Sequence, residues 1–278
     1  MYKFIVCDLD GNLLNNKRSL GFETVETLDK MFRLNKSLII ATGRSYSLIP
    51  DELFEIKCLK YLIGCNGAVI YDKIQNKTIY EHSIEKEISL KIIESTNDLE
   101  LSIQLLFIDE IIANDTEINN KMLDVFVKSY GLKTKKISND INKTIFESNK
   151  NVLKFDIFGK EKNIKEAYMR LHLEKSIEVA LCGPTNIEIT RKDSTKGKTL
   201  KRLVEYLNIS KEDILCFGDS GNDLSMKYEG FSFVAPNNAS LYVKNKADYI
   251  IGNNFDDGVA KEINRLMKNK DFWLNYYD

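Results

Sequence analysis

Phe4-Ile5-Val6-Cys7-Asp8-Leu9-Asp10-Gly11 is a short apolar run that ends abruptly in two acidic residues and a glycine. The pattern returns late in the chain, where Ile214-Leu215-Cys216-Phe217 leads directly into Gly218-Asp219-Ser220-Gly221-Asn222-Asp223. An apolar run of this length before Asp and Gly is typical of a buried strand with carboxylates at its C-terminal end. In an open parallel sheet, ligands bind at that edge. The two runs therefore predict a parallel sheet with one shared acidic site.

Apolar strands alternate with helical patterns over residues 1–82 and again from residue 184 onward. This alternation predicts an α/β fold with a doubly wound parallel sheet, covered by helices on both faces. The expected strands are 3–7, 37–41, 61–64, 214–217, 231–235 and 249–251, with a hairpin over 68–71 and 78–82. The expected helices are 21–34, 45–54, 199–207, 223–228 and 258–267.

Residues 83–183 have no strand that ends in Asp-Gly, and their mixed pattern predicts a separate α+β unit inserted into the first. Its expected helices are 85–96, 119–130 and 162–173, and its expected strands are 100–107, 151–158 and 176–182. Cys182-Gly183-Pro184-Thr185 is predicted to be the exit linker, because Gly-Pro breaks regular structure. The Lys/Asn-rich stretch 133–151 is predicted to be a solvated surface excursion. The expected domains are 1–82 with 184–278, and 83–183.

Composition excludes several classes of protein. Lys and Arg number 40 against 41 Asp and Glu, so the chain has no overall basic field to attract nucleic acid or anionic lipid. No segment approaches the ~18 apolar residues that a membrane span needs, and the N-terminus is too short and acidic for a signal peptide. Five cysteines without a CxxC pair favour a reducing cytoplasm. The only histidines, His82 and His172, belong to no cluster, which disfavours zinc and Ser-His chemistry.

Asp8 and Asp10 have the spacing of two carboxylates on one side of an extended chain, because residues i and i+2 share a face. One can attack phosphorus while the other carries a proton to the leaving oxygen. Asp219 and Asp223 offer the oxygen ligands that Mg²⁺ prefers. The alternatives are ordinary acidic residues at a strand end for the first pair and an Asx-rich helix cap for the second.

Two further motifs lie between the acidic ones. The strand expected at 37–41 ends in Thr42-Gly43-Arg44, which brings a hydroxyl and backbone N–H groups to the same sheet edge. Such donors stabilise charge on phosphoryl oxygens. Lys196-Gly197-Lys198 precedes the helix expected from residue 199, where a lysine can complete an anion site. Taken alone, Thr-Gly-Arg is uninformative, and either lysine is an ordinary surface charge in most proteins.

The order of the four motifs resembles the haloacid dehalogenase (HAD) superfamily of phosphotransferases, and this resemblance spans the chain. It is similar in particular to Cof-like phosphatases, in which an α/β cap is inserted between the second and third motifs. Cys65-Asn66-Gly67-Ala68, Asn238-Ala239-Ser240 and Ala247-Asp248-Tyr249 match turns of that branch. Asn12 departs from the usual Thr, and Asn237 from the usual Gly.

The resemblance implies a Rossmann-like core, an aspartyl-phosphate formed on Asp8, and Asp10 as the acid that protonates the leaving alcohol and later activates water. The implied Mg²⁺ ligands are Asp8, Asp10 through its backbone carbonyl, Asp219 and Asp223. The implied phosphate-binding residues are Thr42, Gly43 and Lys196, and the implied supporting residues are Gly11, Asn222 and Asn238. The substrate candidates are Arg44 and Asn66.

The sequence thus predicts a Mg²⁺-dependent phosphatase for a small phosphorylated metabolite, either a sugar phosphate or a phosphorylated cofactor. A phosphomutase with the same intermediate and a non-catalytic regulatory binding module on the same scaffold stay open as alternatives. A scaffold that no longer catalyses a reaction should have lost a nucleophile or a metal-binding carboxylate, whereas Asp8, Asp10, Asp219 and Asp223 are all present. We expect a cytoplasmic monomer or weak homodimer with no nucleic-acid or membrane partner.

Overall fold

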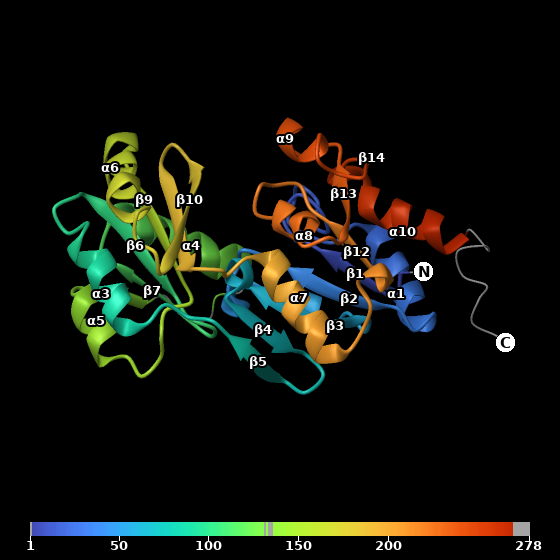
Figure 1. Ribbon diagram of the computed structural model, residues 1–278, viewed down its shortest axis with the longest axis horizontal. Coiled ribbons are helices and arrows are strands. Elements are labelled where there is room, and N and C mark those ends of the chain that lie inside the picture. The colour runs from blue at the N-terminus through green and yellow to red at the C-terminus, as the bar shows by residue number, and fades with distance from the viewer. Residues whose placement is uncertain (1, 131, 133–135, 269–278) are drawn as a thin grey trace.

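The computed structural model describes residues 2–130, 132 and 136–268, which form two lobes side by side (Figure 1). Counting only these residues, one lobe is built on an eight-stranded sheet and the other on a six-stranded sheet. We call the first lobe, residues 2–82 and 192–268, the core. The second lobe, the described residues between 83 and 191, is called the cap.

Strand β1 (Phe4–Cys7) lies between β12 (Ile214–Phe217) and β2 (Ser37–Ala41) and runs parallel to both. The two acidic motifs therefore leave the core sheet at the same edge. The full strand order is β14 (Tyr249–Ile251), β13 (Ser232–Pro236), β12, β1, β2, β3 (Leu59–Gly64), β4 (Val69–Asp72) and β5 (Lys77–Glu81). Neighbours from β14 to β3 are parallel, whereas β3–β4 and β4–β5 are antiparallel pairs.

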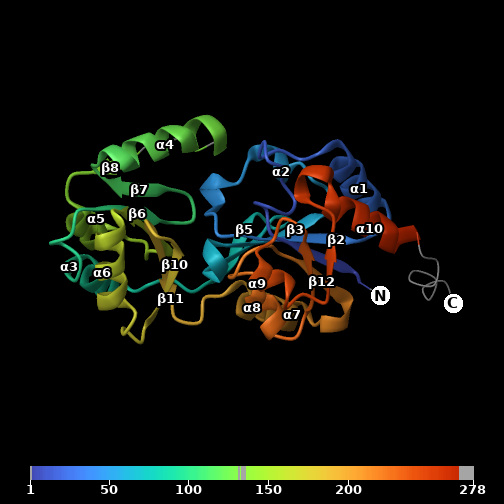
Figure 2. The same ribbon diagram turned by 90° about the horizontal axis from the view of Figure 1, so that it is seen from above.

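Helices cover both faces of the core sheet (Figure 2), with α1 (Phe22–Arg33) and α10 (Gly258–Lys268) on one face and α7 (Lys196–Leu207), α8 (Leu224–Tyr228) and α9 (Leu241–Lys244) on the other. Successive side chains of β1 point to opposite faces of the sheet, which explains why helices pack on both. Ile5 belongs to the apolar cluster that contains α1 and α10, and Val6 belongs to the cluster that contains α7 and α8. The expected doubly wound α/β fold is confirmed, with an antiparallel edge.

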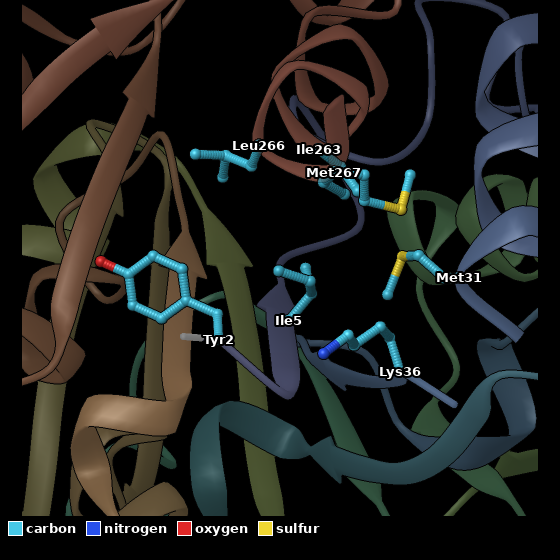
Figure 3. A pocket seen from close by; sticks show the side chains of 7 residues that line it. All are labelled: Tyr2, Ile5, Met31, Lys36, Ile263, Leu266 and Met267. Atoms are coloured by element: carbon cyan, nitrogen blue, oxygen red, sulfur yellow. The ribbon is translucent and has the colours of Figure 1, made fainter. Parts of the chain in front are cut away.

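Figure 3 shows the side chains from α1, α10 and the start of β1 that line a small pocket on this face. Its volume is only about 10 Å³, barely what one water molecule needs, so this face is packed core rather than a binding site. The residues around it are Tyr2, Ile5, Met31, Lys36, Ile263, Leu266 and Met267.

The cap sheet has the order β10 (Ile177–Gly183), β11 (Asn186–Arg191), β9 (Lys154–Gly159), β6 (Leu101–Leu106), β7 (Ile111–Asn114) and β8 (Lys136–Ser138). Helices α3 (Lys86–Glu94), α5 (Ile141–Glu147) and α6 (Glu161–Leu171) pack on one face, and α4 (Glu117–Tyr130) lies on the other. Phe155 and Ile189 point into the first of these faces. Their strand neighbours Lys154 and Glu188 therefore point toward the core.

An apolar cluster joins the two lobes. It combines residues from the core and the cap in a single packed group, so the cap is seated on the core rather than tethered by linkers alone. Its buried members are Leu48, Cys65, Ala68 and Val69 from the core and Leu106, Ile111, Ala113, Leu123, Leu132 and Leu153 from the cap.

The linker predicted at residues 182–185 is wrong. Gly183 is instead the last residue of β10, and Pro184 lies in the turn of the β10–β11 hairpin. The second strand of that hairpin, β11, also pairs with β9. Gly-Pro marked a break in regular structure correctly, but the break is a tight turn inside the cap. We propose that the second domain boundary lies in residues 192–195, between β11 and α7, rather than at 183/184. Residues 1 and 269–278 of the expected core lie outside the described residues.

Other segments also differ from expectation. The helix predicted at 45–54 is two short turns, because Pro50 interrupts it. The stretch predicted as a surface excursion contains β8 and α5, although residues 133–135 lie outside the described part of the chain. The short turns of helix in the core are η1 (Tyr46–Leu48), α2 (Asp51–Phe54), η2 (Cys65–Gly67), η3 (Lys211–Asp213) and η4 (Asn254–Asp256).

Candidate active site

The acidic residues converge at the C-terminal edge of the core sheet. The backbone N–H of Asp8 still bonds to the Phe217 carbonyl at 3.2 Å, so the end of β1 is held against the end of β12. In the same way the N–H of Thr42 bonds to the Ile63 carbonyl at 2.8 Å. These ladder bonds extend one residue beyond each strand and fix where the side chains begin.

Lys196 lies at the centre of this edge with 1% of its surface exposed. Its Nζ is 2.9 Å from Asp8 Oδ1 and 2.7 Å from Asp223 Oδ1, which joins the first motif to the last. The start of α7 brings it there. The Thr195 side chain caps the helix by accepting from the Lys198 N–H, and Gly197 allows the backbones of α7 and α8 to meet, since a Cβ there would lie 2.0 Å from the Ser225 carbonyl oxygen.

Asp8, Asp219 and Asp223 bring carboxylate oxygens within 4.8 Å of one another. Asp223 has both oxygens engaged, because Oδ2 accepts from the backbone N–H groups of Asp219 and Ser220 at 3.0 Å each. Asp219 is oriented by Asn12, whose Nδ2 donates to its Oδ1 at 2.7 Å. Clustered hard oxygen donors at a sheet edge fit a divalent cation of the Mg²⁺ type.

The electrostatics of this cluster also favour a cation. Burial raises the pKa of Asp8 to about 7, although Lys196 opposes the shift. Burial and the Asp223 charge raise the pKa of Asp219 to about 6. Burial disfavours the charged form of Lys196, but Asp223 and Asp8 outweigh it and raise its pKa. Three carboxylates share one ammonium, so the site carries an excess of negative charge.

Asp10 does not join this cluster. Its carboxylate forms a two-point ion pair with Arg44, with Nε 2.8 Å from Oδ2 and Nη2 2.5 Å from Oδ1. Arg44 is 8% exposed and also donates from Nη1 to the Leu48 carbonyl at 3.2 Å. The structure therefore places the Asp10 carboxylate against Arg44, while the ligand predicted at this residue is its backbone carbonyl. The roles of Asp10 as a metal ligand and of Arg44 as a substrate contact stay predictions.

The loop Thr42-Gly43-Arg44 is fastened to η2. The N–H of Cys65 donates to the Arg44 carbonyl at 2.9 Å, and the N–H of Asn66 donates to the Thr42 carbonyl at 3.1 Å. Asn66 has φ +57°, a left-handed conformation that Asn tolerates better than most residues. Gly43 leaves room for it, because a Cβ there would lie 2.9 Å from Asn66 Oδ1.

The predicted supporting residues surround the cluster. Gly11 has φ +77°, and a Cβ there would lie 2.5 Å from Asp219 Oδ2, so only glycine fits the turn. Asn238 Nδ2 donates to the Gly11 carbonyl at 2.8 Å, which fastens that turn to the loop after β13. Asn222 Nδ2 donates to Asn66 Oδ1 at 3.0 Å. These contacts bring all the predicted site residues to one edge, while their roles stay predictions.

A cavity of about 630 Å³ lies between this edge and the β10–β11 hairpin of the cap. Core residues Lys196, Ser220 and Asn222 line one side, and cap residues Cys182 and Glu188 line the other. A cavity of this size suits a small-molecule ligand.

A sequence model of haloacid dehalogenase-like hydrolases matches residues 5–263, nearly the whole chain. The chain belongs to the haloacid dehalogenase-like hydrolases. The predicted superfamily and its Cof-like branch are thereby confirmed.

Similar proteins cover nearly the full length of this haloacid dehalogenase-like hydrolase. It is 26% identical over 266 residues to the 5-amino-6-(5-phospho-D-ribitylamino)uracil phosphatase of Bacillus subtilis (strain 168), which spans 94% of each chain. It is 27% identical to the pyridoxal phosphate phosphatase of Escherichia coli (strain K12), over 94% of this chain and 97% of the relative. A haloacid dehalogenase-like hydrolase from Bacteroides thetaiotaomicron superposes with a TM-score of 0.83 at 27% identity, covering 96% of this chain and 100% of that one.

Two further observations concern membrane-spanning helices and the cysteines of this haloacid dehalogenase-like hydrolase. Within the described residues, no helix combines the length and apolar character that crossing a membrane requires. All five cysteines are free thiols; Cys182 is exposed and the others are buried, and burial raises the pKa of thiols such as Cys65.

Sequence reasoning missed two residues of the site. Asn12 was noted only as a departure from the family pattern, yet it holds Asp219. Glu188 was assigned no role, because the linker was expected just before it. The alternation Ile187-Glu188-Ile189 was the available signal, since a single charge between buried apolar neighbours indicates a strand with one polar face.

Proposed function

We propose that this protein is a Mg²⁺-dependent phosphatase that hydrolyses a small phosphorylated metabolite through an aspartyl-phosphate on Asp8. Phosphatase action on small phosphorylated substrates agrees with the family and with the named phosphatases among its relatives. Those two relatives act on a phosphorylated ribityl compound and on a phosphorylated cofactor. A sugar phosphate or a phosphorylated cofactor is therefore the proposed substrate class here.

The observation that carries this proposal is the Asp8–Lys196–Asp223 bridge. Lys196 contacts Oδ1 of Asp8 at 2.9 Å, and we propose that the other oxygen attacks phosphorus while the ester oxygen departs. The ammonium and the donors of Thr42 and Gly43 would offset charge on the transferring phosphoryl oxygens. Water would then attack the aspartyl-phosphate and release inorganic phosphate.

Asp10 is proposed as the general acid and base. It would donate a proton to the departing alkoxide and later accept one from the attacking water. Its ion pair with Arg44 at 2.5 Å and 2.8 Å restricts the carboxylate to one orientation. We propose that Arg44 is a positioning residue for Asp10 rather than a substrate ligand.

Asp8 and Asp219 are the proposed direct ligands of Mg²⁺. Both are less fully engaged than Asp223, whose two oxygens already accept from Lys196 and from two backbone N–H groups. Asp223 would then orient Lys196 and the loop rather than coordinate directly. When bound, the metal supplies positive charge that stabilises the transferring phosphoryl group.

The two alternative functions, a phosphomutase and a regulatory binding module, predict different products and different site residues. A phosphomutase would return the phosphoryl group to the sugar and release no net phosphate. A regulatory module would not need the buried Asp8–Lys196 pair with its raised Asp8 pKa. A cytoplasmic location and a monomer or weak homodimer stay predictions.

Phosphate release from a panel of sugar phosphates, nucleotides and phosphorylated cofactors tests the proposal. We expect release to require Mg²⁺ and to fall by about a thousandfold or more in Asp8→Asn. The matched control is Asp29→Asn, at an exposed carboxylate of α1 that pairs with Arg33. Isomerised product without phosphate would favour the mutase. Absence of any turnover by folded, Mg²⁺-loaded protein would favour the binding module.

A further inference from the structure

Glu188 stands in the cap wall of the cavity, on the face of β11 that looks toward the core. Its Oε2 accepts a hydrogen bond from Asn66 Nδ2 at 2.5 Å, and its Oε1 lies 3.1 Å from Lys154 Nζ. The side chain is 22% exposed, so the carboxylate is held from both lobes yet still reaches the cavity. Each carboxylate oxygen can accept two hydrogen bonds, which leaves acceptor capacity for a ligand.

Lys154 keeps this carboxylate in place from behind. It is 3% exposed and also lies 2.9 Å from Asp156 Oδ1, on the residue paired across the sheet with Glu188. Burial opposes ionisation of Glu188, but Lys154 and the Asn66 hydrogen bond together lower its pKa below the ordinary value. Burial raises the pKa of Asp156 to about 7. Of the two carboxylates, Glu188 is therefore the one whose ionised form the surroundings favour.

The cavity wall offers no spare cation to balance a second anionic group. Among the described residues that line it, the charged ones are Glu178, Glu188 and Lys196. Lys196 is shared by Asp8 and Asp223, and Glu178 is already paired with Lys192. A substrate carboxylate or second phosphate in this space would meet the Glu188 carboxylate directly, because the cation that pairs with Glu188, Lys154, lies behind it and is shared with Asp156.

We propose that Glu188 is a specificity-determining residue that accepts hydrogen bonds from the leaving group of the substrate. It selects phosphate monoesters whose leaving group presents hydroxyl or ammonium donors and carries no further anionic group. This inference rests on the proposed phosphatase function and names its substrate class. A site built to accept hydrogen bonds discriminates strongly against ligands that cannot donate them, because its own polar groups are then left unpaired.

Matched substrate pairs test the assignment. Glucose 6-phosphate and 6-phosphogluconate form one pair, and glycerol 3-phosphate and 3-phosphoglycerate form the other; in each pair the second member adds a carboxylate. Phenyl phosphate, which has neither donors nor a second charge on its leaving group, reports the core chemistry alone. All five are assayed with Mg²⁺ on the full chain, on Glu188→Gln and on Glu147→Gln.

Glu147→Gln is the control because it removes the same charge from the cap at a side chain that is 63% exposed on α5. Glu188→Gln should fold, because Lys154 keeps Asp156 as a partner; an unchanged melting temperature checks this.

In the unmodified protein and in Glu147→Gln, we expect kcat/KM for the neutral member of a pair to exceed that of its anionic partner by at least tenfold. Glu188→Gln should reduce this preference by tenfold or more, chiefly through KM. The proposal is overturned if neither neutral substrate exceeds its partner, or if Glu188→Gln leaves the preference intact. If neither the unmodified protein nor the two variants turn over phenyl phosphate, the proposed phosphatase function itself is contradicted.

Discussion

Asp8, Asp219 and Asp223 place three carboxylates around one buried ammonium, and two of the three have a raised pKa. Protons and a divalent cation therefore compete for the same oxygens. Because the pKa values of Asp8 and Asp219 are about 7 and about 6, both groups are largely ionised at pH 8 and largely protonated at pH 5. A protonated carboxyl group is a poor ligand for Mg²⁺.

The first prediction concerns this competition. Mg²⁺ affinity should fall by about tenfold or more between pH 8 and pH 5.5, with protons released on binding at pH 6 to 7. Calorimetric titrations in two buffers of different ionisation enthalpy measure both quantities. Equal affinity at the two pH values, or no proton release, would contradict the assignment of Asp8 and Asp219 as ligands.

The second prediction contrasts two neighbouring carboxylates in the metal-free protein. Asp219 has a folded pKa above its unfolded value, so its stabilising effect is complete below pH 3.8 and is lost as the pH rises through about 6. At pH 8 its charge therefore opposes folding, and Asp219→Asn should melt no lower than the unmodified protein. Asp223 is fully buried and holds Lys196, so Asp223→Asn should cost about 3 kcal/mol or more. Thermal melts in EDTA at pH 8 compare the two, and a large loss in Asp219→Asn would be inconsistent with this view.

At the scale of elements, the contact between α7 and α8 positions Lys196. Gly197→Ala would bring a Cβ within 2.0 Å of the Ser225 carbonyl oxygen, and we expect a loss of about 1–3 kcal/mol from overpacking. Gly221→Ala is the matched stability control, since a Cβ there would meet nothing within 4 Å. Denaturant melts of both variants measure the difference. Equal stability of the two would mean that α7 can shift without cost.

The sequence sufficed to predict the central strands β1, β2, β12 and β13, because each is a largely buried apolar run followed by polar residues or glycine. It did not suffice for β8 and α5, whose Lys/Asn-rich pattern resembles a surface loop and whose order depends on packing against the rest of the cap. The β11 strand was missed because Gly183-Pro184 signals a break without saying which elements it separates. Side-chain pairings such as Arg44 with Asp10 depend on how distant loops meet, which local pattern does not encode.

At the scale of the whole molecule, Asn66 links the lobes. It donates to Glu188 of the cap and accepts from Asn222 of the core. Asn66→Ala should loosen the contact between the lobes and raise the radius of gyration, because it removes the hydrogen bond from Asn66 to Glu188 that joins the core to the cap. Small-angle X-ray scattering measures the change, with Asn120→Ala as the control, since the Asn120 side chain bonds to Asp115 and Thr116 nearby in the cap. Identical scattering from both variants would show that Asn66 contributes nothing to closure.

The apolar cluster shared by the lobes has a consequence for how the molecule melts. Leu106 and Leu153 of the cap complete their burial in the same cluster as Leu48 and Val69 of the core, so unfolding of either lobe exposes apolar side chains of the other. Scanning calorimetry should therefore give one heat-capacity peak, with calorimetric and van't Hoff enthalpies nearly equal. Two separated peaks would indicate independent units. Grafting this cap onto a related core would, by the same reasoning, also require transplanting the core residues on which it sits.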